Sequence, residues 1–203
     1  MIKTAIFDFG GVLAEEGFRE GLLAIARKYG LDPEAFFADV DSLIEKTGYL
    51  TGMADEASFW NAVRAATGIG GDDGALRREI LSRFVLRPEM VAEVDALRAA
   101  GLSVTMLSDQ TNWLDELDAE TALSRHFDRV FNSFRMHKSK RDASVFRDVC
   151  AELGAAPGET LFIDDNINHI RRAESQGLQT IHFVRVVDFK RQLKKWFLEI
   201  AAR

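Results

Sequence analysis

The chain has 203 residues, of which 47% are hydrophobic and 29% charged, a composition typical of a folded globular protein rather than a disordered one. Acidic residues outnumber basic ones by 32 to 26, and the resulting net charge of −6 argues against nucleic acid or an anionic membrane as the main partner. The single cysteine, Cys150, excludes an intrachain disulfide. We find neither the pattern of a signal peptide nor an apolar membrane span, and we expect a cytoplasmic protein.

The N-terminal residues 3–9 predict a buried strand that runs directly into a pair of glycines. Asp8 lies at the end of this apolar run, and Gly10 and Gly11 follow it. A single acid at the carboxyl end of a strand is where open α/β sheets place their chemistry. Aspartate is also a common turn residue, so this stretch alone leaves both interpretations open.

Residues 18–84 show helical periodicity without a convincing strand. Gly30 ends a first helix, and Asp32 with Pro33 gives the second an N-cap followed by a first-turn proline. Asp55 caps a third helix, and the glycine-rich stretch 68–74 precedes a fourth. We therefore predict an all-helical insert over residues 15–86, with residues 1–14 and 87–203 forming the other domain. We expect the loop 48–53 to line a pocket, and the insert's aromatic residues (Phe36, Phe37, Phe59, Trp60) to form its own core.

After Pro88, helices and strands alternate. Strands are predicted at 102–107, 127–131, 160–163 and 179–183, and a closing helix at 189–200, whereas 135–142 has no clear structure. Alternation of this kind requires crossover connections and predicts an α/β fold with a Rossmann-like, doubly wound parallel sheet. An insert that leaves after the first strand would lie over the carboxyl ends of the strands, where ligands bind.

Three of these strands end in polar side chains: Asp8, Ser108, and the pair Asp164 and Asp165. Adjacent carboxylates repel each other unless a cation or a shared proton relieves them. An oxygen-rich site of this kind suits Mg²⁺, and phosphate is a common anionic companion of that ion. A lysine from the stretch 135–141 could balance the remaining charge.

Four segments, in this order, carry a resemblance to a known family: IFDFGGVL (6–13), VTMLSDQTN (104–112), FNSFRMHKSKRDASVF (131–146) and LFIDDN (161–166). The chain resembles the haloacid dehalogenase-like hydrolases, in the branch whose helical cap follows the first strand. The resemblance covers essentially the whole chain. In that family the four segments supply a nucleophilic aspartate, a phosphate-binding hydroxyl, a lysine and an acidic metal site.

The resemblance implies a role for each matching residue. Asp8 would attack phosphorus and form an aspartyl-phosphate, which divides one difficult step into two. Lys140 would take part in catalysis, with Lys138 as the alternative lysine. The implied phosphate-binding residues are Ser108, Asp109, Lys140 and Gly11, and the implied Mg²⁺ ligands are Asp8, Gly10 through its carbonyl, Asp165 and Asp164.

Gly10 departs from the pattern of the family's phosphatases, which usually carry a second aspartate there as general acid and base. Such catalysis contributes about two to four orders of magnitude in rate. Some small cytoplasmic sugar-phosphate phosphatases look similar at this position. A substrate hydroxyl, a good leaving group, or Glu15, Glu16 or His137 would have to compensate. His169 occupies a place where the family often has asparagine, and we give it no main role.

The sequence therefore predicts a Mg²⁺-dependent phosphatase that acts on a small phosphorylated metabolite, with a sugar phosphate as one candidate. Two alternatives stay open. A metal-independent 2-haloacid dehalogenase-type hydrolase also lacks the second aspartate, but it would not gain from the pair Asp164 and Asp165. A non-catalytic phosphate-binding protein would explain Gly10 but not the retained Asp8 and Lys140. The sequence indicates neither the substrate nor the oligomeric state.

Overall fold

The structure, a computed structural model, describes residues 1–201, with side chains described as far as Trp196. Its centre is a five-stranded sheet in the order β3-β2-β1-β4-β5, in which every neighbouring pair is parallel. The strands are β1 (Thr4–Phe7), β2 (Ser103–Ser108), β3 (Arg129–Asn132), β4 (Thr160–Asp164) and β5 (Gln179–His182). The α/β class and the parallel sheet predicted from the sequence are confirmed.

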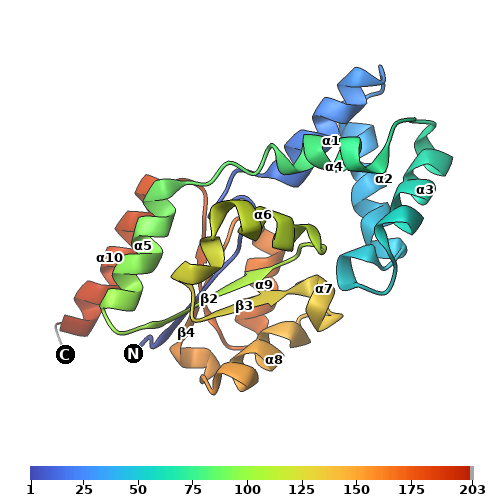
Figure 1. The fold of residues 1–203 in the computed structure, drawn as a ribbon. Coiled ribbons are helices and arrows are strands. Elements are labelled where there is room, and N and C mark those ends of the chain that lie inside the picture. Colours follow the sequence, from blue (N-terminus) through green and yellow to red (C-terminus); the bar gives the residue numbers. More distant parts are fainter. Residues whose placement is uncertain (202–203) are drawn as a thin grey trace.

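Helices cover both faces of the sheet (Figure 1). They are α5 (Pro88–Ala99), α6 (Trp113–Thr121), α8 (Ser144–Leu153), α9 (Ile167–Ser175) and α10 (Val186–Ala201). Strand side chains alternate between the faces. In β1, Ile6 packs with the residues of α8 and α9, whereas Ala5 and Phe7 belong to the cluster that includes α5 and α10. Burial on both faces explains why β1 and β4 are buried along their whole length and mainly apolar, whereas the edge strands β3 and β5 are partly exposed and carry polar residues.

Four helices, which we call the helical segment, lie together beyond one end of the sheet (Figure 1). They are α1 (Gly17–Lys28), α2 (Pro33–Lys46), α3 (Glu56–Thr67) and α4 (Asp73–Leu81). The predicted caps form: Asp32 accepts a hydrogen bond from the backbone N–H of Ala35, and Asp55 accepts one from that of Ser58, both at 2.8 Å. Each satisfies an N–H group that the first helical turn leaves free.

Two predictions for the helical segment need correction. The stretch 48–53 is not only a loop, because it contains the short 3₁₀ helix η1 (Tyr49–Thr51). Its aromatic residues do not form a separate core. Phe36, Phe59 and Trp60 are buried, but the ring of Trp60 stacks on Trp113 of α6 with 6.1 Å between centroids. The aromatic core is therefore shared with the helices of the sheet.

The stretch 135–142, which the sequence left without structure, begins in the short helix α7 (Ser133–Met136) and continues as an ordered loop. His137, at φ 54°, turns the chain out of α7. Two further 3₁₀ turns, η2 (Leu123–His126) and η3 (Pro157–Glu159), lead towards β3 and β4.

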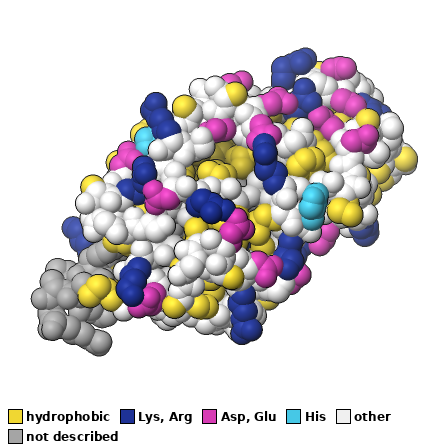
Figure 2. Space-filling model, turned by 60° about the horizontal axis from the view of Figure 1, so that its bottom comes forward, with side chains coloured by type: hydrophobic (Ala, Val, Ile, Leu, Met, Phe, Trp, Pro, Cys, Tyr) yellow, Lys and Arg dark blue, Asp and Glu magenta, His cyan; other side chains and the backbone are white. Residues whose placement is uncertain are grey.

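Charges of both signs are interspersed over the face shown in Figure 2, without a broad area of one sign. Such a surface lacks the basic footprint of a nucleic-acid-binding face. Within the described part of the chain, no helix combines the length and the apolar character that a membrane span requires.

Candidate functional site

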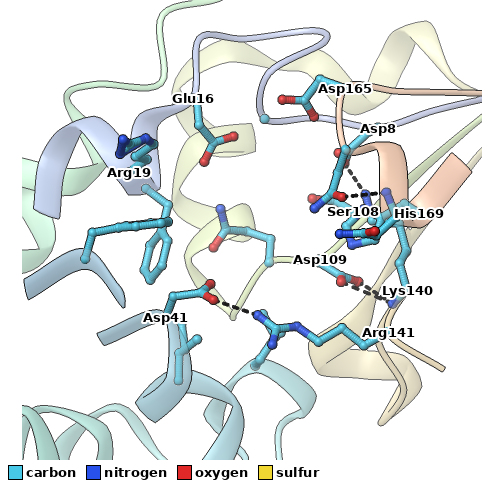
Figure 3. Close-up of a pocket in the computed structure, with 18 of the residues that line it drawn as sticks. Asp8, Glu16, Arg19, Asp41, Ser108, Asp109, Lys140, Arg141, Asp165 and His169 are labelled. Carbon is cyan, nitrogen blue, oxygen red and sulfur yellow. Dashed lines mark hydrogen bonds and ion pairs between the residues drawn. The ribbon is translucent and has the colours of Figure 1, made fainter. Parts of the chain in front are cut away.

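The carboxyl ends of β1, β2 and β4 meet at one edge of the sheet and bring together Asp8, Ser108 and Asp164. In the register of the sheet, Phe7 lies opposite Met106 on one side and Ile163 on the other. The backbone N–H of Asp8 continues this ladder by donating to the Ile163 carbonyl at 2.9 Å. The three polar side chains are buried, with exposed fractions of 7%, 2% and 0%. The structure therefore brings together the three side chains that the sequence predicted to meet, and Figure 3 shows two of them, Asp8 and Ser108.

Lys140 bridges two carboxylates at the centre of this edge. Its Nζ lies 2.7 Å from Asp8 Oδ1 and 2.7 Å from Asp164 Oδ2, and only 1% of its side chain is exposed. Lys138, the alternative lysine, instead pairs with Asp148 on α8 and is 31% exposed. The structure thus places Lys140 in the site and Lys138 outside it.

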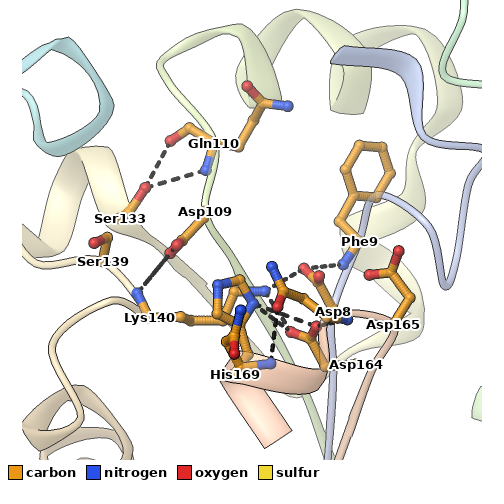
Figure 4. A network of polar contacts seen from close by, with 12 residues as sticks. Asp8, Phe9, Asp109, Gln110, Ser133, Ser139, Lys140, Asp164, Asp165 and His169 are labelled. Carbon is orange, nitrogen blue, oxygen red and sulfur yellow. Dashed lines mark hydrogen bonds and ion pairs between the residues drawn. The ribbon is translucent and has the colours of Figure 1, made fainter. Parts of the chain in front are cut away.

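Asp109 holds the loop that carries Lys140. Its two carboxylate oxygens accept the backbone N–H of Lys140 at 2.9 and 3.1 Å (Figure 4). The side chain of Asp109 therefore positions the lysine loop. The phosphate-binding role that the resemblance implied for Asp109 stays a prediction, and its backbone N–H rather than its carboxylate would have to fill it.

Gly11 allows the backbone to pass directly beside Asp165. Its φ is +79°, and a Cβ at this position would lie 2.2 Å from Asp165 Oδ2. Its carbonyl accepts a hydrogen bond from the guanidinium of Arg87. Only glycine meets both requirements, since other residues rarely adopt this φ and have no space here.

The carboxylates of the site have opposed pKa shifts. Burial and the negative charge of Asp164 raise the pKa of Asp8 well above its usual value. Burial also acts against ionisation of Asp164, but Lys140 and His169 outweigh it and hold the pKa of Asp164 below its usual range. Burial, followed by the charge of Asp164, raises the pKa of Asp165. The site therefore holds more negative charge than Lys140 alone compensates.

This excess of carboxylate oxygens fits a divalent cation. Asp8, Asp164 and His169 each have a donor atom within 4.8 Å of the others. The oxygens of Asp164, however, are already engaged by Lys140 and by the backbone N–H of Asn166, each at 2.7 Å. The Asp165 carboxylate has no side-chain partner among the described residues, and it lines the open pocket together with Asp8 and Gly10. We therefore expect Asp8 and Asp165 to provide the oxygens for a cation, with Asp164 behind them.

A pocket of about 560 Å³ opens above these residues. The sheet edge provides its acidic floor, and the helical segment provides part of its wall, including Phe37 from α2 and Leu50 from η1. Phe37, which we expected in the core of the insert, thus lines the pocket, as does Leu50 from the stretch 48–53 that we expected there. The volume is typical of a site for a small molecule.

Of the three side chains considered as replacements for the missing acid at position 10, the structure brings one into the pocket. Glu16 lines it, and burial followed by the charge of Asp165 raises the pKa of Glu16 to about 7. Glu15 is 55% exposed and pairs with Arg87 at 2.7 Å. His137 donates from Nδ1 to the Thr51 carbonyl at 2.8 Å and does not line the pocket.

Three contacts hold the helical segment against the sheet domain close to the pocket. The Tyr49 hydroxyl donates to Asn112 Oδ1 at 2.6 Å. The Ser133 hydroxyl donates to the Leu50 carbonyl at 2.9 Å. Arg141, the residue after Lys140, pairs with Asp41 of α2 at 2.9 Å (Figure 3). Sequence reasoning did not find Asp41 or Arg141, because nothing in their local pattern shows that they meet.

Fold and site together define a Rossmann-like α/β protein with a lysine-bridged acidic site at the carboxyl edge of its parallel sheet. Comparison with protein families matches residues 2–177 to the haloacid dehalogenase-like hydrolases. The chain belongs to this family, as its four sequence segments predicted.

Similar proteins include two called enolase-phosphatase E1. The protein from Klebsiella pneumoniae is 27% identical over 144 residues, which are 67% of this chain and 59% of that protein. The chain thus spans less than two thirds of that relative. The protein from Stenotrophomonas maltophilia is 26% identical over 207 residues, with 93% of this chain and 82% of that protein covered.

Among solved structures, a HAD family enzyme from Bacteroides thetaiotaomicron, in complex with magnesium and inorganic phosphate, has a TM-score of 0.68. The alignment covers 89% of this chain and 93% of that one at 22% identity. At this identity the likeness shows a common fold.

Proposed function

We propose that this protein is a Mg²⁺-dependent phosphatase of a small phosphorylated metabolite, with Asp8 as the nucleophile. The observation that carries the proposal is that Asp8, which lines a small-molecule pocket together with Asp165, shares the buried ammonium group of Lys140 with Asp164. Asp8 Oδ1 is held at 2.7 Å by Lys140 and at 2.7 Å by the backbone N–H of Phe9. Within the described residues nothing engages Oδ2, which leaves that oxygen for attack on phosphorus.

The other residues of the edge supply the electrostatics that a phosphate dianion requires. The buried hydroxyl of Ser108 lies at the end of the neighbouring strand, where it can donate to a phosphate oxygen. Lys140 offsets part of the negative charge that develops during transfer. A bound Mg²⁺, held by Asp8, Asp165 and the Gly10 carbonyl with support from Asp164, would supply further positive charge. A cation would also favour the ionised form of Asp8, whose pKa is otherwise raised by burial.

The helical segment, over residues 15–86, acts in this proposal as a cap on a core formed by 1–14 and 87–203. Its contacts through Tyr49, Leu50 and Asp41 close one side of the pocket, which limits the access of water during the reaction. Arg19 and Arg172 add positive charge to a wall that also contains Asn168. This mixture suits a polar, anionic molecule of the sugar-phosphate type. The free cysteine, Cys150, fits the cytoplasmic location predicted from the sequence.

The test is release of inorganic phosphate from an aryl phosphate and from a panel of phosphorylated metabolites. Activity should require Mg²⁺, stop with EDTA and disappear in Asp8→Asn. The matched control, Asp39→Asn, changes an exposed aspartate on α2 and should retain full activity.

Three other results would change the assignment. Turnover that persists in EDTA would refute the role of the metal. Release of halide from a 2-haloacid would identify a dehalogenase. Tight binding of phosphate without any turnover would identify a binding protein.

A further inference from the structure

Hydrolysis of an alkyl phosphate through an aspartyl-phosphate needs a proton donor for the leaving oxygen and then a base for the attacking water. Asp8 cannot serve as this acid and base, because it is the nucleophile in the proposed function. The inference rests on that function. Gly10 has no side chain that could do it. The structure must therefore provide the group from elsewhere in the pocket, or the reaction must proceed without one.

Most acidic side chains that line the pocket are already committed. Asp109 is bound to the backbone of Lys140, and Asp41 is paired with Arg141. Asp165 lies beside Asp8 and Gly11, where the proposed cation would be held. Glu16 is different, because no side chain in the described part of the chain forms a hydrogen bond or ion pair with its carboxylate. The polar group beside it is the backbone N–H of Arg19 in the first turn of α1.

Glu16 also lies at the position that the chemistry requires. Its Oε2 is 3.2 Å from the point where a Cβ on Gly10 would be. The carboxylate thus fills the space that a side chain at position 10 would enter, although it comes from the beginning of α1. Figure 3 shows Glu16 pointing into the pocket from the side of the helical segment, towards the region of Asp165 and Asp8.

The backbone beside Glu16 is fixed by close packing. A Cβ on Gly17 would lie 2.4 Å from the ring of Phe84, so α1 begins in direct contact with that ring. The N–H of Glu15 donates to the Val85 carbonyl at 2.9 Å. These contacts hold the start of α1 against the chain that returns to the sheet, and they direct Glu16 rather than Glu15 into the pocket.

We propose that Glu16 is the general acid and base of the reaction, in place of a side chain at position 10. In the first step Asp8 forms a bond to phosphorus, the bond between phosphorus and the leaving oxygen breaks, and Glu16 gives its proton to that oxygen. In the second step Glu16 takes a proton from water as the water oxygen bonds to phosphorus. The bond between phosphorus and Asp8 then breaks, and phosphate, the alcohol and the original side chains result.

The first experiment compares Glu16→Gln with wild type on two kinds of substrate. On an alkyl phosphate, kcat should fall on the order of 10²- to 10⁴-fold, because the leaving alkoxide needs the proton. On 2,4-dinitrophenyl phosphate, whose leaving group needs no proton, the first step should remain fast. Without a base for water, the variant should then release a burst of dinitrophenolate equal to the enzyme and accumulate acid-trapped phosphoenzyme.

Glu20→Gln is the matched control, because Glu20 lies one turn further along α1 and is exposed. It should behave as wild type on both substrates. An equal loss on both substrates without a burst in Glu16→Gln would indicate a structural role and overturn the proposal. Unchanged turnover of the alkyl phosphate would overturn it as well.

A second experiment moves the carboxylate. Gly10→Asp combined with Glu16→Ala should recover part of the alkyl phosphate activity that Glu16→Ala loses, whereas Gly10→Asp alone should lower activity by crowding Glu16. Failure of the double variant to exceed Glu16→Ala, with its fold intact by circular dichroism, would contradict the shared position. An inactive wild-type enzyme would refute the proposed function itself, whereas an active wild type with a fully active Glu16→Gln would refute only this inference.

Discussion

Replacement of Lys140 by methionine tests the central ion pairs of the site. The substitution keeps the length and the apolar stem of the side chain but removes the charge between Asp8 and Asp164, each 2.7 Å from Nζ. Both carboxylates are buried, with 7% and 0% of the residue exposed. In metal-free protein, these two carboxylates would then face each other without the positive charge of Lys140.

The expected cost is large, because the loss of one partner from a buried ion pair typically destabilises a protein by about 3–5 kcal/mol. The cost should depend on pH. In the wild type Lys140 helps to hold the pKa of Asp164 low, so its contribution is present at neutral pH and is lost only in strong acid. Without Lys140 the folded-state pKa values of both carboxylates rise, and the variant regains stability as they take up protons. The difference from wild type should therefore be greatest near pH 7.5 and smaller near pH 5.

The assay is urea denaturation in EDTA, followed by tryptophan fluorescence and analysed by linear extrapolation. Lys138→Met is the matched control, because Lys138 is 31% exposed and pairs with Asp148 at the surface. It should change the free energy of unfolding far less than Lys140→Met does, because solvent screens an exposed ion pair. Equal effects of the two substitutions, or a Lys140→Met cost that does not shrink in acid, would refute this account of the site.

Three further outcomes are expected. In metal-free protein, burial and the charge of Asp165 raise the pKa of Glu16 from its usual 4.5 to about 7. The folded state therefore keeps this proton to higher pH than the unfolded state, and the wild type should lose about 3 kcal/mol of stability relative to Glu16→Gln between pH 4.5 and 8. Parallel profiles of unfolding free energy against pH, measured in urea, would contradict this. Gly11→Ala should abolish phosphatase activity, because its Cβ would lie 2.2 Å from Asp165 Oδ2. Gly30→Ala also has a positive φ, +67°, but meets no atom within 4 Å, so it should only lower the melting temperature slightly. Tyr49→Phe removes the 2.6 Å hydrogen bond from the helical segment to Asn112 at the start of α6. We expect the free energy of unfolding to fall by about 0.5–1.5 kcal/mol and KM to rise. An unchanged KM would argue against a cap that depends on this contact.

The sequence by itself determined most of the fold, because the signals involved are local. Apolar runs of strand length alternating with helical patterns require crossovers, and these require a parallel sheet. Asp32 and Asp55 mark helix starts through contacts within three residues. The sequence also predicted that Asp8, Ser108 and Asp164 meet, because parallel strands end at the same edge.

Tertiary structure decided which of several similar residues reach the site. Lys138 and Lys140 are two positions apart in a stretch without periodicity, and the contact of Asp109 with the Lys140 backbone selects the second. The adjacent Glu15 and Glu16 are equivalent in sequence. Only the packing of the start of α1 against Phe84 turns Glu16 inwards, so that its carboxylate fills the space that Gly10 leaves open. Such choices depend on contacts between residues far apart in the chain, and no local pattern records them.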